Sequence, residues 1–179
     1  SVRVETDDNI IKHIETYEEG GVLYIDIEKN FNPKPSNGIK VHVSAPALRK
    51  ITASGACDVF SSERLTYAEG FSLKLSGASD GELDVKAPKL TANLTGAGKL
   101  KLKGETRDLE IKGTGSSDIE GFEMMAENVS VKITGAGEAE VFASVSLDVN
   151  VTGSGSVKYK GSPSVSQKIS GAGSIKKVP

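Results

Sequence analysis

The chain of 179 residues contains no tryptophan, a single cysteine, two histidines and two methionines. Because Cys57 is alone, a disulfide within the chain is excluded. Aromatic residues make up only 5% of the chain, so a groove lined with aromatic rings that stack against sugars is not expected. No run of about 18 apolar residues occurs, and no membrane-spanning helix is predicted. No secretory leader is recognisable at Ser1, where the chain opens without methionine.

An excess of positive charge is also missing. Lys+Arg number 22 against 24 Asp+Glu, which leaves a formal net charge of −2. Nucleic-acid binding needs a clustered basic surface, so nucleic acid is not an expected partner. The abundant residue is instead glycine, with 20 copies and no low-complexity tract, which indicates many turns at defined places.

A short phrase of small residues recurs seven times along the chain. It reads TGAG at Thr95–Gly98 and at Thr134–Gly137, with the variants SGAC, SGAS, TGSS, TGSG and SGAG elsewhere. Steps of 18 to 22 residues separate the glycines that follow the Ser or Thr of each phrase, which are Gly55, Gly77, Gly96, Gly115, Gly135, Gly153 and Gly171. Repeats of this length predict a stacked, coiled architecture.

The residues around each repeated glycine alternate in polarity. Leu73 and Leu75 enclose Lys74 before Gly77, and the same order of mostly apolar and polar residues precedes the other glycines. The alternation continues after the turn, where six of the seven repeats carry a charged residue five positions after the glycine. A period of two is typical of a strand with one buried face.

Equivalent residues, and not only equivalent patterns, recur at each turn. Antiparallel hairpins would not require one turn sequence to return in register, whereas a coil of about 19 residues stacks like on like at the ~4.8 Å strand spacing. We therefore predict an all-β fold, a single-stranded parallel β-helix of about seven rungs over residues 45–179, and we expect a right-handed coil. The repeated glycines indicate positive φ or a backbone too crowded for a Cβ atom. Because a strand and not a helix follows each phrase, it is interpreted as architecture and not as a phosphate-binding loop.

Residues 1–44 lack the repeat. The segments VRVE, IIKHIETYEEGGVLYIDIE and GIKVHVS are predicted as strands, with turns at Glu19–Gly21 and in the loop Asn32–Gly38. We expect this segment to continue into the helix and to cap its N-terminal end, where an open core and a sheet edge would otherwise be exposed.

These phrases resemble a known family, the putative auto-transporter adhesin, head GIN domain proteins, which are domains of unknown function common in Bacteroidetes. The resemblance rests on IIKHIETYEEGGVLYIDI, on IKVHVSAPALRKITASGACDV and on the serial phrases LTANLTGAGKLKL and VKITGAGEAEV, and it covers nearly the whole chain. It implies a β-helical protein of the cell envelope, periplasmic, on the outer-membrane surface or extracellular. It carries over no catalytic residues.

Two columns of charged residues are candidate sites. Asp58 and Asp80, each three residues after a repeated glycine, are the best pair for a weak cation site. The alternative is that such carboxylates satisfy backbone N–H groups at an exposed bend, and we favour it because Lys99 interrupts their column. The second column consists of Lys74, Lys112, Lys132 and Lys168, a ladder that could bind an anionic polymer. The simpler interpretation of this ladder is a solvated outer face that discourages sheet-edge aggregation.

The remaining chemistry-bearing residues give no pattern. His13 and His42 lack the spacing of a zinc site, so no metal is predicted at either. Cys57 takes a position that Gly or Ser fills in other repeats and is interpreted as a small core residue. No cofactor and no catalytic residue is predicted.

We therefore predict a non-catalytic cell-envelope scaffold or adhesin-like interaction module. Its expected partners are a glycan or an envelope or host surface protein. One alternative is a polysaccharide lyase or hydrolase on the same fold, which needs a carboxylate cluster with Arg or Lys nearby in a cleft. Another is a polymerising scaffold resembling bactofilins, in which the helix ends join copies into a homo-oligomer.

Overall fold

A computed structural model describes residues 1–36, 38–45 and 48–179. The chain forms two compact units, Ser1–Pro46 and Ala47–Pro179. Nearly every element in both is a β-strand, and the only helix among the described residues is the short α1 (Asp8–Ile11), so no helix there has the length needed to cross a membrane.

The first unit contains two small antiparallel sheets. One pairs β1 (Val2–Glu5) with β4 (Lys40–Val43), and the other is a hairpin of β2 (Ile14–Glu19) and β3 (Val22–Ile27). The hairpin turn at Gly20 and Gly21 has positive φ at both residues, as the sequence predicted for a tight turn. That this unit caps the solenoid stays a prediction.

The expectation of a strand through Ile10 was wrong. Residues 8–11 form the helical turn α1, which begins after Asp7 in an extended conformation and carries Asp8 in its first turn. The Asp7 carbonyl accepts the N–H groups of Ile10 and Ile11, and the turn buries the Ile10 side chain to 1% exposure. Burial of one isoleucine in a small unit thus overrides its preference for a strand.

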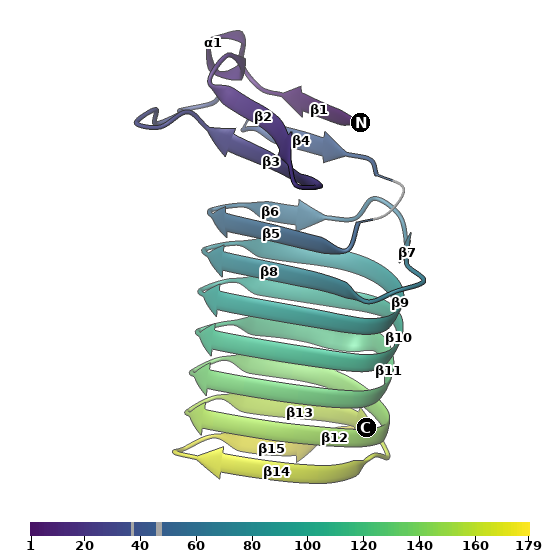
Figure 1. Ribbon diagram of the computed structural model, residues 1–179. Helices are drawn as coiled ribbons and strands as arrows, with labels where there is room; N and C mark the ends of the chain where they lie inside the picture. The colour runs from purple at the N-terminus through teal and green to yellow at the C-terminus, as the bar shows by residue number, and fades with distance from the viewer. Residues whose placement is uncertain (37, 46–47) are drawn as a thin grey trace. The chain divides into compact units, whose positions relative to one another are not determined.

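The second unit is a parallel β-solenoid of about seven turns, which confirms the predicted fold (Figure 1). Each turn passes through two strand layers. The layer that leads into the repeated glycines is here called face 1. Three whole strands belong to it: β5 (Lys50–Gly55), β8 (Phe71–Gly77) and β14 (Ser164–Ser170). It also contains the second halves of four long strands: β9 (Asp80–Gly96), β10 (Lys99–Gly115), β11 (Asp118–Gly135) and β12 (Glu138–Gly153). The layer that follows the glycines is called face 2, and it consists of β6 (Asp58–Phe60), β7 (Leu65–Thr66), the first halves of β9 to β12, β13 (Ser156–Gly161) and β15 (Ser174–Lys177).

Apolar side chains from both faces fill the space between them. One column, Leu73, Ala92, Ile111, Val131 and Val149, is in register across five rungs and is at most 1% exposed. The strands β9 to β12 are 16 to 18 residues long because each passes from face 2 around a corner into face 1. Pro88 lies in such a corner, between the ladder partners Ala87 and Lys89, where no backbone donor is needed. The APAL corner at Ala45–Leu48 falls partly outside the described residues.

The seven repeated glycines lie in a single file along the solenoid. Their φ values run from 95° to 117°, a region that side-chain-bearing residues rarely adopt. The backbone is also crowded there: a Cβ atom at Gly96 would lie 2.3 Å from the carbonyl oxygen of Gly77. That carbonyl accepts the N–H of Ala97 at 3.0 Å, so the close approach is part of the bonding between rungs.

The two faces differ in regularity. On face 1, from Lys50 to Ser170, each strand pairs with the next without a shift in register. On face 2 the register shifts between Lys101 and Lys103 and between Gly121 and Met125, and a third shift lies in the corner after Ala126. Face 1 therefore presents a repeating surface, while face 2 is interrupted.

Candidate binding surface

Face 1 exposes three columns of polar side chains, because alternate residues of each strand point outward. The column next to the glycines contains only hydroxyl residues: Ser54, Ser76, Thr95, Thr114, Thr134, Thr152 and Ser170. The second column is Thr52, Lys74, Asn93, Lys112, Lys132, Asn150 and Lys168. The third is Lys50, Ser72, Thr91, Glu110, Ser130, Asp148 and Ser166. The residues of these three columns include no aromatic and no large apolar side chain.

The four lysines singled out from the sequence share the second column and are all exposed. Lys112 and Lys132 are direct neighbours on adjacent rungs, whereas Asn93 and Asn150 each separate two lysines.

The ammonium groups of this column differ in their partners. Lys112 binds the Glu110 carboxylate at 2.5 Å, and this hydrogen bond lowers the pKa of Glu110, with a further contribution from Lys89. Within the part of the chain that the structure describes, Lys74, Lys132 and Lys168 form no ion pair. Three of the four lysines in this column therefore have no ion-pair partner among the described residues.

Face 2 carries many charges of both signs, arranged as ion pairs between rungs. Lys99 lies 2.5 Å from Glu120, and that hydrogen bond raises the pKa of Lys99. Lys101 and Lys103 both contact Glu82, at 3.8 and 3.7 Å. Exposed ion pairs of this kind stabilise a protein by only about 0–1 kcal/mol each, but they neutralise the surface.

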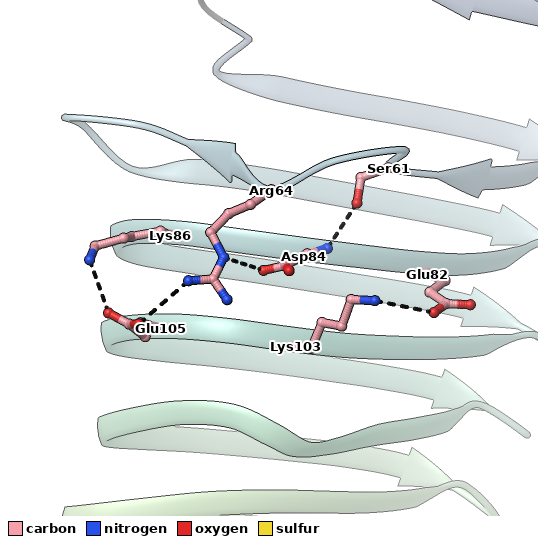
Figure 2. Close-up of polar contacts among 7 residues, drawn as sticks. All are labelled: Ser61, Arg64, Glu82, Asp84, Lys86, Lys103 and Glu105. Atoms are coloured by element: carbon pink, nitrogen blue, oxygen red, sulfur yellow. Dashed lines mark hydrogen bonds and ion pairs between the residues drawn. The ribbon is translucent and has the colours of Figure 1, made fainter.

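Figure 2 shows one such group in the first rungs. The guanidinium of Arg64 lies between two carboxylates, 2.8 Å from Asp84 and 3.5 Å from Glu105, and the Lys86 ammonium lies 3.1 Å from Glu105. The backbone N–H of Asp84 donates to the Ser61 hydroxyl at 2.9 Å. Each carboxylate in this group is held by a cation of a neighbouring rung.

The proposed cation pair lies on adjacent rungs, with Asp58 in register with Asp80. The Asp80 carboxylate accepts the backbone N–H of Lys99 at 2.8 Å. Among the described residues, no group of three or more His, Cys, Asp and Glu side chains converges as a metal site would require. We expect a calcium titration to leave the melting temperature unchanged. A calcium-dependent rise that Asp58→Asn abolishes would contradict this expectation.

A shallow groove of about 490 Å³, which the repeat pattern did not predict, lies at the corner where face 2 turns into face 1. Its lining includes Tyr67, Arg107, Met125 and Phe142. Met125 is 44% exposed because the register shift after Gly121 brings it opposite Phe142 and turns it outward. The one sign of this irregularity in the sequence is the repeat length. Gly115 and Gly135 are 20 residues apart, whereas the two following repeats are each 18 residues long.

A ladder of polar side chains runs along the same corner. The Ser146 hydroxyl donates to the Asn128 side-chain carbonyl at 2.8 Å, and the Asn128 amide donates to the Asp108 carboxylate at 3.0 Å. Arg107 binds the other carboxylate oxygen at 2.9 Å. The pKa of Asp108 is lowered, first by the hydrogen bond from Asn128 and then by the one from Arg107.

We expect Asn128→Ala to raise the pKa of Asp108 toward its ordinary value, because the variant removes the largest cause of the shift. Carboxyl NMR titration would measure this, with Ser130→Ala on the same rung as the control. Since the folded-state pKa lies below the unfolded value, the ladder stabilises the fold above the unfolded pKa. This contribution is lost as the pH falls through the folded-state pKa. An unchanged pKa in Asn128→Ala would contradict the assignment.

The histidines and the cysteine occupy separate, local environments. The His13 ring stacks on Phe31 with centroids 3.8 Å apart, and its Nδ1 lies 2.5 Å from Glu28. His42 lies 3.6 Å from Glu5 on the neighbouring strand. Cys57 is half-buried, and its thiol donates to the Ser54 carbonyl at 3.2 Å.

Comparison with known proteins adds a family and several related structures. A family model described as "Putative auto-transporter adhesin, head GIN domain" matches residues 1–163. A crystal structure of a putative adhesin from Bacteroides fragilis is 27% identical, with a TM-score of 0.93 over 99% of this chain and 82% of the other. A putative lipid binding protein from Parabacteroides distasonis is 26% identical, with a TM-score of 0.70 over 99% of this chain and 84% of the other. A putative adhesin from Parabacteroides merdae, 22% identical, shares the fold with a TM-score of 0.80 over 99% and 83%. No curated protein matches the chain.

Proposed function

The chain belongs to the family of the auto-transporter adhesin head GIN domain, and on that premise we propose that it is a non-catalytic, adhesin-like interaction module of the bacterial cell envelope. Face 1 is the surface that we propose binds the partner. The observation that carries the proposal is the unbroken register of face 1, which repeats three exposed polar columns along the solenoid.

A repeating flat surface suits an extended partner. Each rung adds a similar set of hydroxyl, amide and ammonium groups at a spacing of about 4.8 Å. A partner that lies along the solenoid can then gain many weak contacts, and no preformed pocket is needed. The partners we propose are a glycan or a protein of the envelope or of a host surface.

An array of glycans and extracellular matrix proteins, probed with the labelled protein, tests this function. We expect the wild type to bind at least one class of partner. The double variant Thr114→Gln, Thr134→Gln places longer side chains in the hydroxyl column, and we expect it to weaken binding about tenfold. The matched control is Lys101→Gln, Glu120→Gln on face 2, which should bind like the wild type. Equal loss in both variants would contradict the assignment to face 1.

The alternative function is that of a polysaccharide-processing enzyme with its active site in the corner groove. The groove contains Glu105 and Glu127 beside Lys86 and Arg107. Glu105 is 53% exposed and is already bound by Lys86 and Arg64, an arrangement typical of a surface ion pair and not of a shielded catalytic acid. Release of reducing ends from a glycan panel by the wild type, and its loss in Glu105→Gln, would contradict a non-catalytic role.

Binding of a lipid in the groove is a second candidate function, and the exposed Met125 beside the half-buried Phe142 favours it. The likeness to a putative lipid binding protein from Parabacteroides distasonis supports the same idea. Titration with a fluorescent fatty acid tests it. Saturable binding that Met125→Glu abolishes would support this function, and no change in fluorescence would contradict it.

End-to-end assembly of copies into a homo-oligomer stays a prediction. Light scattering over a range of concentrations tests it, and a strict monomer would contradict it.

A further inference from the structure

We propose that face 1 binds a linear acidic polysaccharide, which lies along the lysine column from Lys74 to Lys168. This inference rests on the proposed function and names the chemical class of its partner. The recognition combines the free ammonium groups of Lys74, Lys132 and Lys168 with the hydroxyl and amide groups beside them.

The distribution of charge between the faces is the first argument. The three outward columns of face 1 contain five lysines and two acids, although the whole chain has a net charge of −2. One of the two acids, Glu110, is bound by both Lys112 and Lys89. The outward columns of the regular face therefore carry a net positive charge, which attracts anions from solution.

The pairing of the lysines is the second argument. On face 2, five of the eight lysines contact a glutamate through their ammonium groups, namely Lys86, Lys99, Lys101, Lys103 and Lys158. The other three, Lys160, Lys176 and Lys177, lie in the last two strands of this face, β13 and β15. On face 1, among the residues that the structure describes, only Lys112 of the four ladder lysines does so. An ammonium group that already binds a carboxylate has its charge partly neutralised and one of its three N–H donors in use. The ammonium groups of Lys74, Lys132 and Lys168 have no such ion pair among the described residues.

The spacing of the column indicates a linear polymer. Lys112 and Lys132 are one rung apart, about 4.8 Å, while Asn93 and Asn150 extend the other intervals to two rungs, about 10 Å. One sugar of an extended polysaccharide spans a similar length to one rung. Negative groups on every sugar or on alternate sugars can therefore meet successive lysines.

The neighbouring columns favour a polysaccharide over other polyanions. Ser and Thr hydroxyls occupy every position beside the glycines, and such groups exchange hydrogen bonds with sugar hydroxyls. Single-stranded nucleic acid would be expected to use aromatic side chains for stacking, and face 1 has none in its outward columns. A membrane surface would be expected to receive apolar side chains, which these columns also lack.

The probe for the test is size-defined heparin, a sulfated linear polysaccharide, titrated into the full chain at low and at moderate salt. We expect saturable binding that weakens as salt increases. The triple variant Lys74→Gln, Lys132→Gln, Lys168→Gln should weaken this binding by roughly tenfold or more. The matched control is Lys86→Gln, Lys101→Gln, Lys103→Gln, which changes the net charge equally on face 2 and should stay within about twofold of the wild type. Circular dichroism melts establish that both variants are folded.

Absence of heparin binding, or equal loss in the two triple variants, would overturn the proposal. Equal affinity for a double-stranded DNA oligonucleotide or for vesicles of phosphatidylglycerol would also overturn it, because recognition would then depend on charge alone. The array experiment separates this inference from the proposed function. If array partners bind the wild type and are lost in Thr114→Gln, Thr134→Gln while heparin does not bind, face 1 is an interaction surface for another class of partner.

Discussion

Gly115→Ala is expected to destabilise the solenoid by about 4 kcal/mol, for two physical reasons that add. The residue has a φ of 101°, where an alanine is strained. Its Cβ atom would also lie 2.5 Å from the carbonyl oxygen of Gly96. That carbonyl accepts the N–H of Ser116 at 2.9 Å, so the rungs cannot separate to relieve the contact without weakening this hydrogen bond.

Gly55 provides a control that separates the two causes. Its φ of 100° is nearly the same, but a Cβ atom there meets nothing within 4 Å. Gly55→Ala should therefore show only the backbone strain, about 2 kcal/mol. Urea denaturation followed by circular dichroism measures both variants. Equal losses would mean that strain alone explains the repeated glycine, and that the contact between neighbouring rungs contributes nothing.

Ile133→Ala is expected to cost about 3 kcal/mol, because the residue is 1% exposed and packs between the two faces. A Cβ atom added at Gly155 would lie only 2.6 Å from the Cγ2 atom of Ile133. The backbone of the next rung is therefore packed directly against this side chain. Removing three carbon atoms there leaves a cavity that this close-packed layer can fill only by moving backbone.

Ile169 belongs to the same column two rungs later and is the matched control. It is 37% exposed, so Ile169→Ala should cost about 1 kcal/mol. The same urea denaturation measures this pair. In a solenoid each rung contacts only its neighbours, so a defect at Ile133 should also broaden the unfolding transition. A loss at Ile133 no greater than that at Ile169 would contradict the assignment of the core.

The agreement between the predicted and the observed solenoid depends on particular residues. Leu73 and Leu75 alternate with Lys74, and the same alternation returns about 19 residues later, so the side chains that face the core could be assigned from the sequence. The repeated glycines could likewise be placed in one file, because a coil of constant length stacks each residue on its equivalent. These features are local or strictly periodic.

The features that distinguish the two faces could not be obtained in this way. The sequence placed Lys112 and Lys132 in one column, but only the structure shows that Lys112 binds Glu110 while Lys132 has no such partner among the described residues. Met125 became visible as a groove residue only through the shift in register after Gly121. The helical turn at Asp8–Ile11 likewise depends on the burial of Ile10 within its unit.

By itself, then, the sequence determined the β-solenoid, the inward and outward sets of residues and the file of glycines, because a period of two and a repeat of 18 to 22 residues leave one way to stack the chain. The tertiary structure decided which charges are neutralised, where the corner opens into a groove and which face stays regular. Those outcomes depend on how far side chains reach between rungs, and on the extra residues that a few rungs contain. Neither property appears as a period in the sequence.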